Sequence, residues 1–190
     1  MSRILGPAIH QCFVYPDFDS ALARFAAGGI GPFYVMRSEG GEGRHRGVVK
    51  PLDISVAFVF SGDTCMEIIA PHGPQENAYV DFLEQNPGGG LHHVAYYSTD
   101  FEASLAAMEA AGHPLRIVQE FYDTNTGEVF EIYCEPVGVD NPVCFQLLRP
   151  GVFDAWFDAM HAAAANWDGK EPIRNAMALM QATMAPAEAG

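Results

Sequence analysis

The sequence predicts an α+β fold in which two paired βαβββ modules form a curved, cleft-bearing mixed sheet, followed by a C-terminal helical extension. Two observations predict the modules. When His10 is aligned with His93, an offset of 83 residues, the two halves match without a gap and Leu22 falls on Leu105. In each half an apolar run precedes a helix-forming stretch and three further strand-like runs. A third observation, a helical pattern after residue 150 that matches neither half, predicts the extension.

The first module is expected at residues 8–72. Asp17 follows the first apolar run and suits the N-cap of a helix, because its carboxylate can accept hydrogen bonds from the first helical turn. Gly28 or Gly29 suits the left-handed C-terminal cap. Strand-like runs rich in Val, Ile and Phe follow at residues 33–37, 54–60 and 64–69. The Gly-rich stretch between residues 37 and 50 is expected to be a loop.

The same patterns predict a helical linker at residues 73–90 and the second module at residues 91–149. Residues 75–85 favour a helix, and residues 86–90 form a flexible joint. Asp100 and Gly112 repeat the two caps of the first helix. Three more strands are expected at residues 115–121, 128–134 and 143–148.

The extension at residues 151–190 is expected to contain two helices. Val152, Phe153, Trp156, Phe157 and Met160 form one apolar face. The second helix is predicted by an apolar stripe at spacings of 4, 3 and 4, made of Ile173, Met177, Met180 and Met184. Such a stripe is typical of core or of a dimer contact, and methionine would also suit a lid. A homodimer is therefore expected.

The charge balance excludes several classes of partner. The chain has 190 residues, with 10 Lys and Arg against 24 Asp and Glu, for a net charge of −14. Nucleic acids and anionic membranes attract clustered basic residues, so we expect small molecules or copies of the chain as partners. No apolar run approaches the ~20 residues of a membrane span. The four cysteines stand singly, which is typical of reduced thiols in a cytoplasmic protein.

A shared cleft is expected where the two modules meet. If they pair by a pseudo-twofold axis, His10 and His93 face each other, and the last strand of each module offers Glu67 and Gln146 respectively. Because residues two apart share one face of a strand, three cysteines are expected beside these side chains: Cys12, Cys65 and Cys144. We interpret these thiols as small packing groups.

Several short motifs connect this repeat to a known family. The stretch MEIIAP at residues 66–71, then Phe82-Leu83, then GGLHHVA at residues 89–95, resembles the vicinal oxygen chelate (glyoxalase/bleomycin resistance/dioxygenase) superfamily. Within it, the methylmalonyl-CoA epimerase-like branch is the most similar, over about residues 8 to 149. In that family a divalent metal is held by the first and last strands of each module. The resemblance implies four ligands, namely His10, Glu67, His93 and Gln146, with His92 in a packing or supporting role.

The resemblance further implies a metal-dependent isomerase or epimerase that stabilises the enolate of a carbonyl or acyl-thioester substrate. The ion would be Co, Ni, Mn, Zn or Fe. Glu67 is the expected catalytic residue, because metal-bound glutamates of related glyoxalases also move protons. The epimerases generally carry glutamate where this chain has Gln146, and the sequence does not identify a second acid/base. We interpret the remaining candidates as surface or packing residues: Glu131, Tyr133, His45 and Lys50.

Substrate contacts are expected mainly from the stretch between residues 37 and 50, which carries four of the ten cations. Arg44, Arg46 and Lys50 could bind a phosphate or carboxylate, and Tyr97 is a further candidate. The same site would also suit a glyoxalase-like lyase, an iron-dependent oxygenase, or a non-catalytic binding or resistance protein. The split of the ligands between two modules argues against the oxygenase.

Overall fold

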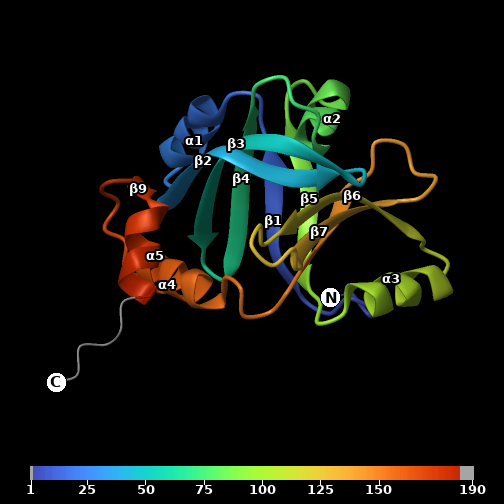
Figure 1. Cartoon of the computed structure of the whole chain (residues 1–190). Helices are drawn as coiled ribbons and strands as arrows, with labels where there is room; N and C mark the ends of the chain where they lie inside the picture. The colour runs from blue at the N-terminus through green and yellow to red at the C-terminus, as the bar shows by residue number, and fades with distance from the viewer. Residues whose placement is uncertain (1, 185–190) are drawn as a thin grey trace.

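The computed structural model describes residues 2–184 and confirms the predicted α+β class. Each half has the order strand, helix and three strands (Figure 1). The first half contains β1 (Ala8–Val14), α1 (Phe18–Ala27), β2 (Phe33–His45), β3 (Val48–Ser61) and β4 (Thr64–His72). After α2 (Ala78–Gln85), the second half contains β5 (Gly90–Tyr97), α3 (Phe101–Ala110), β6 (Leu115–Tyr122), β7 (Val129–Pro136) and β8 (Cys144–Leu148).

The helix of each module begins at the predicted cap. Asp17 Oδ1 accepts a hydrogen bond from Ser20 N at 3.0 Å, and Asp100 Oδ1 accepts one from Ala103 N at 3.0 Å. Each carboxylate thus satisfies a backbone N–H that lacks a partner within the helix. The two modules therefore start in the same way, as the repeat predicts.

The strand order makes the two modules symmetric. The first half runs β2-β3-β4-β1 and the second runs β5-β8-β7-β6, with the antiparallel pair β1–β5 between them. The outer strands β2 and β6 also pair, through Arg44 with Glu120 and His45 with Gln119. The sheet therefore curves until its ends meet at a seam of two residue pairs.

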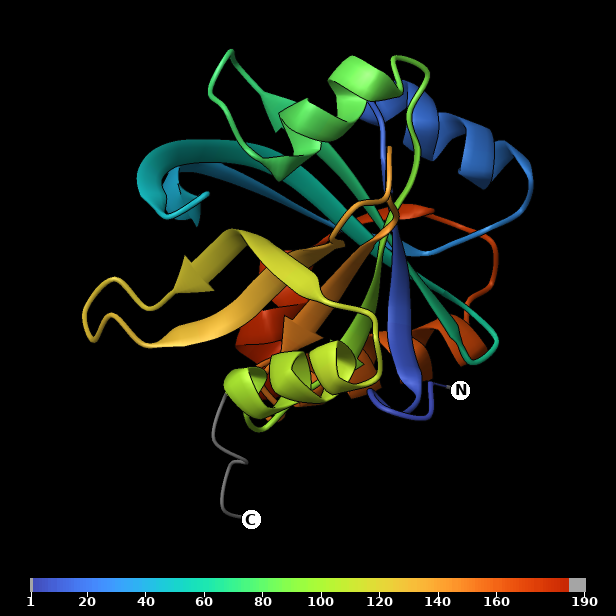
Figure 2. The ribbon, with the colours of Figure 1, turned by 90° about the vertical axis from the view of Figure 1, so that its right-hand side faces the viewer.

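The stretch predicted as a Gly-rich loop between residues 37 and 50 is instead the far end of the β2–β3 hairpin. The strands turn through Arg46 and Gly47, whose φ angles of 49° and 81° give the twist that suits two-residue hairpins. Gly43 lies within β2. A side chain there would be crowded, because its Cβ would lie 2.6 Å from Gln119 Nε2 of β6. In Figure 2 the hairpin (cyan) arches beside β6 and β7 (yellow). Its glycines reflect close strand contact as well as turning.

The extension contains the two predicted helices, α4 (Asp154–Ala165) and α5 (Ala176–Met184), with one difference. Ile173 does not begin the second helix. It lies in a short strand, β9 (Ile173–Asn175), which pairs parallel with Phe33 to Val35 of β2. Residues 173–175 therefore form strand hydrogen bonds with the free side of β2, although the spacing of Ile173 to the methionines is that of a helix.

Three apolar clusters hold the fold together. The helix α1 packs on one outer surface through Phe18 and Leu22, and α3 packs on another through Phe101 and Met108. The third cluster lies inside the curved sheet and includes Trp156 and Phe157 of α4. No helix within residues 2–184 has the length and apolar character needed to cross a membrane.

Candidate metal centre

The strand register places the four predicted ligands at equivalent positions of the two modules. On β1 and β4, His10 lies opposite Cys65, and Glu67 is two residues beyond that cysteine. On β5 and β8, His93 lies opposite Cys144, and Gln146 is again two residues beyond. The two histidines that align in the sequence therefore occupy equivalent positions in the two modules of the structure.

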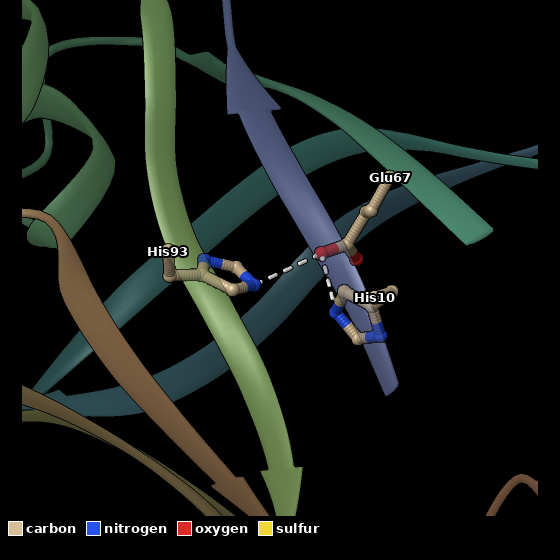
Figure 3. Close-up of side chains that lie close together, drawn as sticks. All are labelled: His10, Glu67 and His93. Atoms are coloured by element: carbon tan, nitrogen blue, oxygen red, sulfur yellow. Dashed lines mark ion pairs between the residues drawn. The ribbon is translucent and has the colours of Figure 1, made fainter. Parts of the chain in front are cut away.

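Three of these side chains meet at one point (Figure 3). Glu67 Oε2 lies 3.3 Å from His10 Nε2 and 3.2 Å from His93 Nε2. The three side chains are almost fully buried, and one potential ligand atom from each lies within 4.8 Å of the others. Buried groups of this kind need partners, since an unsatisfied polar atom in the interior is costly.

The donor atoms fit a metal ion better than they fit each other. Although they are close, His10 Nε2, Glu67 Oε2 and His93 Nε2 have no partner in hydrogen-bonding geometry. Ligands bound at about 2.0–2.2 Å around one ion stand about 3.0–3.5 Å apart, which matches the observed separations. Imidazole and carboxylate are ligands that Co, Ni, Mn, Fe and Zn accept. The observed set therefore fits a divalent transition metal.

The two polar atoms of the Gln146 amide have different surroundings. Its Nε2 donates a hydrogen bond to Glu131 Oε1 at 2.7 Å, whereas its Oε1 is buried without a partner. The amide oxygen is the atom with which glutamine can coordinate a metal. Each of the four predicted ligands thus contributes at least one unpaired buried donor atom.

The protonation states suit metal binding. Burial raises the pKa of Glu67, but the contacts with His10 and His93 outweigh burial and hold that pKa below its usual value. Burial also lowers the pKa of His93. A carboxylate and a neutral imidazole are the forms in which these residues bind metals.

His92 orients its neighbour. Its Nδ1 lies 2.9 Å from Nδ1 of His93, and its ring packs against Tyr79 and Phe82. Because the far nitrogen of a ligating imidazole is usually held by a second group, this contact fixes the ring whose Nε2 faces Glu67. His92 thus has the supporting position that the sequence indicates.

A pocket of about 210 Å³ opens beside the cluster. His10, Glu67 and Gln146 line it, together with apolar side chains of β2, β3 and β7 and three aromatic residues from the start of α4: Phe153, Trp156 and Phe157. The pocket lies inside the curved sheet, and α4 forms part of its wall.

Glu131 is the residue that sequence reasoning underestimated. A surface position is excluded, since this side chain lines the pocket and is only 8 % exposed. Burial, followed by the charge of Glu67, raises the pKa of Glu131 to about 7. Glu131 lies opposite Leu148, and the equivalent position opposite Ile69 is Val56. A carboxylate in one copy where the other has an apolar residue is the signal that could have found it.

Two tyrosines complete the polar wall beside Glu131. Tyr79 of α2 and Tyr133 of β7 line the pocket, and their hydroxyl groups share a hydrogen bond of 2.7 Å. Only one hydroxyl can donate in that bond. Tyr79 lies in the linker between the modules, where the repeat gives no guide to function.

The expected substrate-binding residues lie elsewhere. Arg46 donates to Asp81 Oδ2 at 2.8 Å, Lys50 donates to Glu76 Oε2 at 2.9 Å, and Tyr97 donates to Asp154 Oδ1 at 2.5 Å. The guanidinium of Arg44 lies 4.2 Å from the ring centre of Tyr122. None of the four lines the pocket. The β2–β3 hairpin, in place of the expected loop, carries the three cations to acidic or aromatic neighbours, whereas Tyr97 reaches Asp154 from β5.

The cysteines do not line the pocket either. All four are free and buried, and burial raises the pKa of both Cys12 and Cys144. A protonated, buried thiol is a poor nucleophile and a poor ligand. This supports their interpretation as packing groups, although not their expected place on the cleft surface.

Comparison with known proteins agrees with the architecture. Residues 9–129 match the family model of the glyoxalase/bleomycin resistance protein/dioxygenase superfamily. Ethylmalonyl-CoA/methylmalonyl-CoA epimerase of Cereibacter sphaeroides is 26% identical over 109 residues, which cover 57% of this chain and 73% of that protein. Protein MelA of Shewanella colwelliana is 38% identical over 64 residues, which cover 33% of this chain and only 18% of that protein.

Among solved structures, methylmalonyl-CoA epimerase of Streptomyces coelicolor, in complex with 2-nitronate-propionyl-CoA, has a TM-score of 0.50 and 17% identity. The match covers 78% of this chain and 96% of the epimerase chain. It supports the fold, and it leaves about a fifth of the present chain without a counterpart.

Proposed function

Since the chain belongs to the glyoxalase/bleomycin resistance protein/dioxygenase superfamily, we propose that it is a metal-dependent, epimerase-like isomerase that stabilises the enolate of a carbonyl or acyl-thioester substrate. Relatives named as epimerases support an enzyme of this kind. The single observation that carries the proposal is that four strands each contribute a residue with an unpaired, buried donor atom, and that three of these residues, His10, Glu67 and Gln146, line one pocket.

The metal would be held by His10, Glu67 and His93, with Gln146 as the fourth ligand through its amide oxygen. A divalent ion in this position supplies Lewis-acid stabilisation of an enolate oxygen. His92 keeps the ring of His93 in place through the contact between their Nδ1 atoms. Burial of these groups strengthens their electrostatic effect, because little water competes with them.

Glu131 supplies the acid/base group that the sequence left unidentified. Its carboxyl group lines the pocket but does not belong to the ligand set, so it can accept a proton from the carbon next to the carbonyl and return it. Gln146 holds one oxygen of Glu131 at 2.7 Å and thereby fixes its orientation. Glu67, by contrast, is engaged by two imidazoles, so we assign it first to the metal and second to proton transfer.

The proposal is tested in two steps. Purified protein is first incubated with Co²⁺, Ni²⁺, Mn²⁺, Zn²⁺ or Fe²⁺, and bound metal is measured by mass spectrometry. The loaded protein is then placed in D₂O with methylmalonyl-CoA or 2-hydroxyacetophenone, and exchange of the α protons is followed by NMR. We expect one bound ion per chain and exchange of at least one of the two probes above the buffer rate.

Two substitutions separate the roles. Glu67→Gln should weaken metal binding and abolish exchange, whereas Glu131→Gln should keep the metal and slow exchange roughly 100-fold or more. Failure to bind any of the five ions would refute the proposal. Turnover of the glutathione adduct of methylglyoxal would favour the lyase alternative. Binding of an unchanged ligand that is indifferent to EDTA would favour a binding or resistance protein.

A further inference from the structure

We infer that the substrate is a compact carbonyl compound with an uncharged, apolar body, and that the aromatic side chains of α4 select it over thioesters of coenzyme A. This inference rests on the function proposed above, because it concerns the substrate of that same site. Three features of the pocket support it: its wall, its size and its charges.

The wall that faces the metal ligands is aromatic. The ring centres of Phe157 and His10 lie 6.0 Å apart. Trp156 packs edge-on against Phe58, with 5.1 Å between the ring centres. Phe153 packs against Trp156 and, from the other module, against Phe130. All of these side chains line the pocket, so a substrate bound at the metal meets rings on this side, whereas Glu131, Tyr79 and Tyr133 form a separate, polar part of the wall. Such surfaces favour aromatic or branched apolar groups.

The pocket is also small. Its volume is about 210 Å³. Pockets for drug-sized ligands are typically about 300–1,000 Å³. A small carbonyl compound can be enclosed, whereas the nucleotide and pantetheine arm of coenzyme A would have to lie outside.

The surroundings offer such an arm no phosphate site. None of the ten Lys and Arg side chains, all of which lie in the described part of the chain, lines the pocket. The cations of the β2–β3 hairpin are already engaged: Arg46 with Asp81, and Lys50 with Glu76. Glu42 lies at the pocket itself and accepts a hydrogen bond from Tyr122. Phosphate recognition normally uses free arginine or lysine side chains.

The first helical turn of α4 does not compensate. A helix N-terminus can bind an anion through its free N–H groups. Here Asp154 occupies that turn and accepts a hydrogen bond from Gly151 N at 2.9 Å. The negative carboxylate would repel a phosphate group, so the helix contributes apolar contact rather than anion binding.

The test compares three probes on the metal-loaded protein, with α-proton exchange in D₂O followed by NMR. 2-Hydroxyacetophenone and dihydroxyacetone phosphate share an α-hydroxy ketone head but differ in their phenyl or phosphate-bearing tail. Methylmalonyl-CoA is the third probe. We expect exchange of the phenyl ketone to exceed that of the phosphate by at least about ten-fold, a difference in transition-state binding that one aromatic contact can supply. We expect no exchange of the thioester above the buffer rate.

Substitution of α4 tests the selecting role. Phe153→Ala should lower kcat/KM for the phenyl ketone about ten-fold. Val152→Ala is the matched control, because the neighbouring Val152 is 43 % exposed and does not line the pocket. Trp156→Phe, which keeps an aromatic ring, should retain most of the preference for the phenyl ketone and covers the case in which Phe153→Ala does not fold.

The outcomes distinguish the two proposals. Faster exchange of methylmalonyl-CoA than of the phenyl ketone would overturn the inference and leave the isomerase function standing. The role of α4 would be overturned if folded Phe153→Ala kept the full preference for the phenyl ketone. It would also be overturned if the separate variants Trp156→Phe and Val152→Ala both lost that preference. No exchange of any probe by protein that has bound its metal would overturn both the inference and the proposed function.

Discussion

Gln146 donates its amide N–H to Glu131 at 2.7 Å, while the amide oxygen of the same side chain has no partner. A glutamate at position 146 could not make this contact as a donor when ionised, because a carboxylate only accepts hydrogen bonds. The amide therefore allows a second carboxyl group, Glu131, to lie beside the ligand set.

Exchange of these two residues tests the arrangement. Gln146→Glu should lower the free energy of unfolding by about 1–3 kcal/mol, because two buried carboxyl groups would then compete for one proton. The double variant Gln146→Glu with Glu131→Gln restores one donor and one acceptor and should recover most of the loss. Urea denaturation measures both. Gln11→Glu on the exposed side of β1 serves as control; equal losses in the single and double variants would contradict the pairing.

Metal binding should stabilise the fold measurably. At a free ion concentration of 100 Kd, the gain in free energy of unfolding is about 2.7 kcal/mol. For a chain of this size the gain raises Tm by about 5–10 °C. Differential scanning calorimetry with and without EDTA measures the shift. The shift should disappear in His93→Ala but persist in His113→Ala, whose side chain is exposed and outside the cluster.

The tyrosine pair should show coupled energetics. Tyr79→Phe or Tyr133→Phe alone leaves one buried hydroxyl without its partner and should cost about 1–3 kcal/mol in free energy of unfolding. The double variant should cost clearly less than the sum of the two. Tyr122→Phe, at an exposed hydrogen bond, should change stability by about 0.5 kcal/mol or less. Strict additivity in the double-mutant cycle would show that the two hydroxyl groups are independent.

The seam between β2 and β6 should depend on Gly43. A methyl group there would lie 2.6 Å from Gln119 Nε2 and 3.1 Å from Glu120 O, so Gly43→Ala must displace the buried Gln119 amide and disturb the strand contact at Glu120. We expect a loss of about 1–3 kcal/mol in free energy of unfolding and faster amide hydrogen exchange at residues 44–45. Gly88→Ala is the control, since its added Cβ would meet open space. Unchanged exchange at the seam would contradict the close contact.

The repeat made much of the fold predictable. Asp17 and Asp100 cap equivalent helices, and the strands recur in the same order in both halves. Aligning the two histidines therefore predicted the two modules and the strands that carry the four expected ligands: His10, Glu67, His93 and Gln146. Periodicity and caps are local, so they can be read from neighbouring residues.

What the sequence could not supply depends on contacts between distant strands. Gly43 looks like a loop residue until Gln119 of β6 is seen beside it. Ile173 fits a helical stripe until the free side of β2 offers it a partner. Arg46 looks like an anion site until Asp81 is found at 2.8 Å. The position of Glu131 in the pocket was not predicted, because the alternation of side chains along a strand does not show which face of the sheet lines the pocket.

The departure from symmetry at Val56 and Glu131 has a stereochemical consequence. Both residues line the pocket at equivalent positions of the two modules, one as a hydrocarbon and the other as a carboxylic acid. A flat enolate held between the modules would therefore meet the Glu131 carboxyl group on one side and Val56 on the other, so proton transfer on that second side would fall to Glu67. The scaffold is nearly twofold, but the site it encloses is chiral in function, and it would distinguish the two faces of the carbon on which it acts.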